Sequence, residues 1–367
     1  MKSLFSKVFS VWIITCVLWA EGANEFRKEK LSPQLEDEVH ASIFKKAKTN
    51  QAGALTEHLL ANRQQKQLTE DYPRKRSNFI DHFIFEKMER DGVPSAASAT
   101  DLEFLRRVTL DLTGRIPSPQ EVREFIVNPD PTKRDKLIDR LVNHEAYVDK
   151  WTYFLMDLLR ANGKMGRGRY LFHYWMKENL NSDRPYDEVV RALITASAKS
   201  NHVVASANLI AREHIQGAPQ PQDGDDFSMV QQLDTHDELS IIYAKAFLGI
   251  NLSCVSCHDG QGHLEKVNVY LSGKTREQFF QNAAFLAKTR YLMYWENGKP
   301  QSGEFLIDDG NPGYDTVGAS MIRVPRLGGS SHPAFLLTGE GCKLEENPRN
   351  SFAAILTSHP QFARATV

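Results

Sequence analysis

Two cysteines and a histidine stand in the spacing that most directly indicates chemistry in this chain. Cys254 and Cys257 are separated by two residues, and His258 follows at once. This is the attachment pattern of c-type haem. Two thiols can add to the two vinyl groups of one porphyrin, and the next residue can send an imidazole nitrogen to its iron. The spacing therefore predicts covalent haem c on Cys254 and Cys257, with His258 as the proximal iron ligand.

Other chemistry uses the same residue types. A redox-active Cys-x-x-Cys pair needs a thioredoxin-like strand–helix–strand context, whereas the sequence around this motif has helical spacing. A zinc site needs four ligands, and the motif would have to recruit its fourth from a residue such as His263 or Cys342. A structural disulfide, or free thiols in a protein without cofactor, stay open as well. Among these interpretations the spacing favours haem.

The sixth iron ligand cannot be read from the spacing. Methionine or histidine would be typical, and methionine would tend to raise the reduction potential. For each candidate the ordinary role, a methionine in a core or a histidine at the surface, is the commoner one. An open sixth position would permit an enzymatic reaction, so whether the chain is an enzyme is left open. The candidate residues are Met229, Met293, Met321, His214, His236 and His332.

The N-terminus predicts export. Lys2 and Lys7 precede an apolar run over residues 8–20, and Glu21-Gly22-Ala23 follows. A basic start, a short apolar run and small residues at its end are typical of a secretory signal peptide. The run is short for a membrane span, so no stable transmembrane anchor is expected, an uncleaved anchor being the alternative. Because c-type haem is attached outside the cytoplasm, a signal peptide and a haem motif support one another. We expect a periplasmic or cell-surface location.

Composition is that of an ordinary soluble globular protein. Of the 367 residues, 41% are hydrophobic and 25% are charged, with a formal net charge of −1. Nothing in this balance argues for a nucleic-acid partner. If the chain passes electrons, its partner is a redox protein that the sequence does not identify.

Hydrophobic spacing predicts a mainly α fold, a bundle of short helices with a small hairpin and loop region near the C-terminus. We expect a signal peptide over 1–23 and a charged helical or linker segment over 24–76. A helical domain carrying the motif is expected over 77–290, where capping boxes begin at Thr100 and Ser118. A helix over 236–250 should end just before the motif. Over 291–367 we expect a connector with a hairpin turning at Asn297-Gly298.

Several stretches together resemble the planctomycete-type secreted cytochrome-c-like proteins, whose domain is of largely unknown function. The resemblance covers roughly residues 77–290. It rests on Phe79-Ile80-Asp81, Gly92-Val93-Pro94-Ser95, residues 104–117, Pro119-Gln120-Glu121-Val122, residues 136–141, Trp151, residues 157–160, Asn181, residues 184–187, and residues 247–250 leading into 254–259.

The resemblance implies an exported, mostly helical haem protein. It would serve electron transfer or be the haem module of a larger secreted oxidoreductase. The family's activity is poorly defined, and a non-haem interaction or scaffold module with structural or metal-binding cysteines is the alternative. Many members follow Asp259 with His-Pro, whereas this chain has Gly260-Gln261. Residues 358–367 look like the start of the partner domain that usually follows, so the chain is expected to be truncated there.

Overall fold

The computed structural model describes residues 78–198, 200–215, 227–296, 299–307, 314–315, 320–342 and 345–366. The predicted signal peptide and the predicted segment 24–76 lie outside these residues. The chain divides into two compact units, Met1–Ser98 and Ala99–Val367. In the first, α5 (Phe79–Arg90) begins with a capping box, in which Asn78 and Asp81 each accept from the other's backbone N–H.

The second unit begins with three short helices, α6 (Asp101–Thr113), α7 (Pro119–Val127) and α8 (Lys133–Val142). Both predicted capping boxes are confirmed, Thr100 with Glu103 and Ser118 with Glu121. The apolar faces of the three helices meet in a small core of Leu105, Phe125, Leu137 and Leu141. This core is separate from the larger one that follows in the chain.

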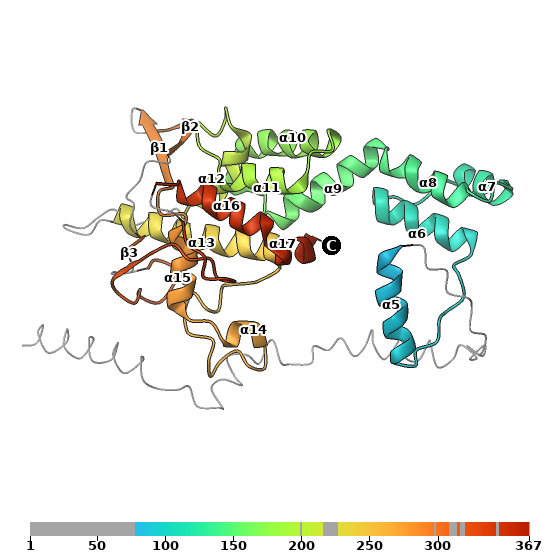
Figure 1. Cartoon of the computed structure of the whole chain (residues 1–367). Helices are drawn as coiled ribbons and strands as arrows, with labels where there is room; N and C mark the ends of the chain where they lie inside the picture. The colour runs from blue at the N-terminus through green and yellow to red at the C-terminus, as the bar shows by residue number, and fades with distance from the viewer. Residues whose placement is uncertain are drawn as a thin grey trace, which may run out of the picture. The chain divides into compact units, whose positions relative to one another are not determined.

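The larger core is built around α13 (Phe227–Leu248), which carries the fully buried side chains of Leu239, Tyr243 and Phe247. α15 and α17 pack against α13, α10 against α9, and α16 against α11 (Figure 1). The further elements are α9 (Glu145–Leu158), η1 (Gly163–Met165), α10 (Gly168–Asn181), α11 (Tyr186–Ile194), η2 (Ala205–Ala207), α12 (Asn208–Glu213), α14 (Val269–Ser272), α15 (Arg276–Ala284), α16 (Pro348–Ser358) and α17 (Pro360–Thr366).

Strands are few, and the mainly α prediction is confirmed. β1 (Arg290–Glu296) and β2 (Lys299–Ile307) form the expected antiparallel hairpin, with its turn outside the described residues. β3 (Tyr314–Asp315) pairs with β4 (Ser330–Ser331). α16 and α17 lie beyond residue 290 in the chain, yet Phe352 and Phe362 belong to the large core. Among the described helices, none combines the length and apolar character needed to cross a bilayer.

Candidate functional site

The Cys-x-x-Cys-His motif begins six residues after the end of α13. Gly249 takes a left-handed conformation (φ 67°), which ends the helix and turns the chain. Leu252 and Val255 are then fully buried in the large core. These apolar side chains anchor the segment from inside, while Cys254, Cys257 and His258 remain half-buried at its surface.

Residues 254–258 form one hydrogen-bonded turn, which we call the motif turn. The carbonyl oxygen of Cys254 accepts from the backbone N–H of Cys257 (3.0 Å) and of His258 (3.2 Å). Residues at spacings of three and four in such a turn share one face. Cys257 and His258 are therefore each placed one turn along the chain from Cys254.

The thiol of Cys254 does not have the electrostatics of a reactive thiolate. Burial raises its pKa, and the neighbouring Cys257 raises it further. Redox-active cysteines are activated by a lowered pKa, so this direction does not favour the redox-active pair. Cys254, Cys257 and Cys342 are all free thiols.

His258 is held in an orientation that suits a metal ligand. Its Nδ1 lies 2.8 Å from the carbonyl oxygen of Asp259. A carbonyl can only accept, so Nδ1 carries the proton and Nε2 keeps its lone pair. A ligating histidine is commonly oriented by such a bond from its other nitrogen. The ring of His263 lies beside it, with centroids 4.6 Å apart.

The residues after His258 are fixed against α14 and α15. Asp259 accepts from the backbone N–H of Arg276 (2.8 Å), at the first residue of α15. Gly260 donates to the carbonyl of Lys274 (2.7 Å), and a Cβ on Gly260 would lie 1.8 Å from the carbonyl oxygen of Leu271. Position 260 therefore has no room for a side chain.

A loop distant in sequence meets the motif turn from another direction. We call residues 320–326 the Arg323 loop. Arg323 Nε donates to the hydroxyl of Ser256 (2.9 Å), between the two cysteines, and its guanidinium also bonds to Glu238 on α13. Ile322 and Val324 in this loop are about half exposed, and Val269 on α14 is 80% exposed. Both elements that contact the motif segment therefore carry exposed apolar side chains.

A buried ionic cluster on α13 holds the Arg323 loop in place. Arg326 bonds to Asp234 (2.7 Å) and Asp237 (3.0 Å), and all three side chains are at most 1% exposed. Asp237 also accepts from the Tyr314 hydroxyl, and Asp234 from the backbone N–H of Met321 (2.7 Å). Burial raises the pKa of Asp237 to about 6, and Arg326 opposes that effect.

Sequence reasoning missed this cluster. Its signal was the run Asp234-Thr235-His236-Asp237-Glu238 inside an otherwise apolar helix. Charged residues in such a helix are expected to be paired when buried, but the partners Arg323 and Arg326 lie more than eighty residues away. Arg160, whose side chain is 38% exposed, also bonds to the buried Glu213 (3.1 Å).

The candidates for the sixth iron ligand lie in different environments in the structure. His214 and His236 are buried, and burial lowers the pKa of each to about 4. The Nε2 of His236 donates to the carbonyl of Thr289 (2.7 Å), and His332 is exposed after β4. Met321 belongs to the Arg323 loop, which contacts the motif turn. The side chains of Met229 and Met293 lie outside the described part of the chain.

The zinc interpretation is not supported by the arrangement. Among the side chains that the structure describes, no three of His, Cys, Asp or Glu are grouped to hold a metal ion. A four-ligand zinc site would need such a group. Haem needs only one protein nitrogen on its iron together with the two thiols, so the same observation does not bear on it.

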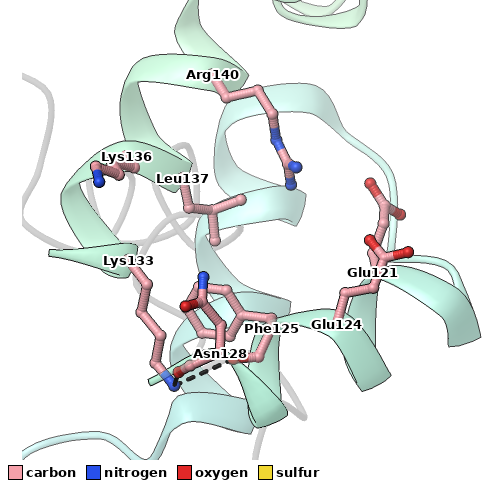
Figure 2. A pocket seen from close by; sticks show the side chains of 8 residues that line it. All are labelled: Glu121, Glu124, Phe125, Asn128, Lys133, Lys136, Leu137 and Arg140. Carbon is pink, nitrogen blue, oxygen red and sulfur yellow. Dashed lines mark hydrogen bonds between the residues drawn. The ribbon is translucent and has the colours of Figure 1, made fainter. Parts of the chain in front are cut away.

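A pocket of about 260 Å³ opens between α7 and α8 (Figure 2). Lys133 donates there to the carbonyls of Phe125 (3.1 Å) and Asn128 (3.0 Å), which caps the end of α7. Hydrogen bonds from Ser118 lower the pKa of Glu121, which is committed to the capping box of the same helix. Lys133 and Glu121 thus serve the two ends of α7, and the motif residues do not line this pocket. The lining residues are Glu121, Glu124, Phe125, Asn128, Lys133, Lys136, Leu137 and Arg140.

Comparison with known proteins finds one family. The model of the PSCyt2 family, described as a protein of unknown function (DUF1549), matches residues 79–290. The match includes the motif turn, α14 and α15, and ends before the Arg323 loop. No curated protein and no solved structure matches the chain.

Proposed function

We propose that this chain, which belongs to the PSCyt2 family of proteins of unknown function, is an exported c-type haem protein that passes electrons. The observation that carries the proposal is the motif turn. Cys254, Cys257 and His258 lie half-buried on a single turn, in which the carbonyl of Cys254 accepts from the backbone N–H of both Cys257 and His258. That arrangement meets the needs of covalent haem attachment.

Each motif residue has a distinct role in this proposal. The thiols of Cys254 and Cys257 would form the two thioether links, and His258 Nε2 would bind the iron while Nδ1 donates to Asp259. When bound, haem supplies an iron that changes oxidation state by one electron. The protein contributes orientation, burial and charge. Among the candidates for the sixth iron ligand, Met321 lies on the Arg323 loop, which contacts the motif turn.

Covalent attachment is the property to test first. The chain is produced in a periplasm with haem-maturation machinery, denatured, and run on a gel that is stained for haem. We expect staining that survives denaturation and a mass increase of one haem. Cys254→Ala and Cys257→Ala should abolish doubly linked haem, whereas the matched control Cys342→Ala should keep it.

The second candidate is a secreted interaction module without haem. It is favoured by one observation, that Leu252 and Val255 anchor the cysteine segment in the large core through protein contacts alone. In that case the wild-type chain would be exported and folded but unstained, while a control cytochrome made in the same cells is stained. That result would reject the haem proposal.

A further inference from the structure

Arg323 makes an unusual contact with the motif turn. Its Nε donates to the hydroxyl of Ser256, which in turn donates to the carbonyl of Ser253 (2.7 Å). Ser256 itself is buried and lies between the two cysteines. The contact spans 67 residues of sequence, and Arg323 lies outside the stretch that the family model matches, whereas Ser256 lies within it. A cation is therefore placed directly against the segment that carries the proposed cofactor links.

Arg323 is held there from two sides. Its guanidinium pairs with Glu238 on α13, and the two side chains are only 9% and 19% exposed. The backbone of its loop is fixed by Asp234, which accepts from Met321 N–H and from the Ser320 hydroxyl (2.8 Å). At such burial, solvent screens charge weakly, so an ionic group acts over a longer range than it does at the surface.

The charges around Arg323 form a connected series. Glu238 also lies 3.8 Å from Arg160, and Arg160 pairs with Glu213 (3.1 Å), which meets Arg212 (3.5 Å). Through Glu238, Arg323 is thus at one end of a chain of alternating charges that leads away from the motif. Removing Arg323 would leave a negative carboxylate near the motif turn, whereas removing the charge of Glu238 would leave a more strongly positive guanidinium.

We propose that Arg323 is a positioning residue for the motif turn, and that its charge, balanced by Glu238, sets the reduction potential of the group bound there. The proposal rests on the proposed function. A positive charge near the iron favours the reduced form, because reduction adds one electron. Arg323 should therefore raise the potential, and Glu238 should lower it.

The decisive test uses the two ends of one ion pair. In a one-electron potentiometric titration of the intact haem-loaded chain, with soluble mediators supplying the electron, Arg323→Gln should shift the potential downwards. Glu238→Gln should shift it upwards. We expect each change to alter the redox equilibrium constant on the order of tenfold, which is about 59 mV for one electron. Arg323→Lys keeps the charge and should restore much of the potential.

The opposite signs of the two expected potential shifts distinguish an electrostatic effect from damage to the fold. A purely structural role would disturb both variants in the same way, so shifts of equal sign, or no shift in either, would overturn the proposal. If Arg323→Gln does not fold, Glu238→Gln still has to raise the potential. A wild-type chain that carries no covalent haem would overturn the proposed function as well, whereas a loaded chain with unmoved potentials would overturn this inference alone.

Ser256→Ala tests the positioning step by itself. The substitution removes the acceptor of Arg323 Nε but leaves both charges in place. We expect a smaller fraction of chains with both thioether links, measured by mass spectrometry of haem peptides, and a potential closer to wild type than in Arg323→Gln. Full attachment in both Ser256→Ala and Arg323→Gln would contradict a positioning role.

Discussion

At the scale of single residues, Gly260 is the position where the motif segment tolerates least change. Its backbone bonds to Lys274 and passes so close to α14 that a Cβ would overlap the carbonyl oxygen of Leu271. Backbone cannot move aside as a flexible side chain can. The absence of a side chain at Gly260 therefore allows the segment after His258 to pack closely against α14.

Gly260→Ala should consequently destabilise the second unit. Overpacking of this kind typically costs about 1–3 kcal/mol, which urea unfolding followed by far-UV circular dichroism can measure. Gly273→Ala is the matched control, because a Cβ there meets nothing nearer than 3.9 Å. Equal unfolding midpoints for the two variants would show that the close approach at Gly260 has no energetic weight.

A second prediction at the scale of single residues concerns Met321 as the sixth iron ligand. If it is the sixth ligand, Met321→Ala should open that position, so the reduced haem-loaded chain would bind carbon monoxide and its visible spectrum would change. Met293→Ala is the comparison, since Met293 is the rival on β1. Carbon monoxide binding by the wild-type chain and by both variants to the same extent would indicate that the position is already open.

At the scale of elements, α13 carries both the large core and the ionic cluster that fixes the Arg323 loop. Arg326 is the cation that balances the buried carboxylates of Asp234 and Asp237. Removing one partner of a buried pair leaves an uncompensated charge, which costs more than the pair contributes. Arg326 is therefore one of the main contacts that hold the Arg323 loop against α13.

Arg326→Met should lower the free energy of unfolding by about 3–5 kcal/mol. Chemical denaturation at neutral pH provides the measurement. Lys136→Met removes an exposed ion pair with Asp130 (2.7 Å) and serves as the control, with an expected loss of at most about 1 kcal/mol. Comparable losses in both variants would refute the distinct role of the buried cluster.

At the scale of the whole second unit, two buried histidines make stability depend on pH. The folded-state pKa values of His214 and His236 are lowered to about 4 by burial, whereas the unfolded chain titrates near the ordinary histidine value of about 6.5. Below pH 6.5 the unfolded state gains protons that the fold excludes. This contribution to stability is complete above pH 6.5 and is lost as the pH falls towards 4.

His236→Gln tests this dependence, because the Gln amide can still donate to the carbonyl of Thr289. Between pH 7 and pH 5 the variant should lose less stability than wild type, by on the order of 1–2 kcal/mol. The measurement is the difference in stability loss between the variant and wild type. This difference is needed because the raised pKa values of Asp237 and Glu213 increase the stability of both proteins as the pH falls. The exposed His332→Gln should follow wild type, and a His236→Gln profile parallel to wild type would contradict the assignment.

The sequence by itself determined the local features. These features all depend on residues a few positions apart: the capping boxes at Thr100 and Ser118, the hairpin after residue 290, and the backbone turn that carries the Cys-x-x-Cys-His motif. Only the tertiary structure decided which residues approach the motif. The bond from Arg323 to Ser256 joins residues 67 positions apart, and that from Arg326 to Asp234 joins residues 92 apart. Local spacing cannot specify such pairs, because buried charges find their partners only when distant elements pack together.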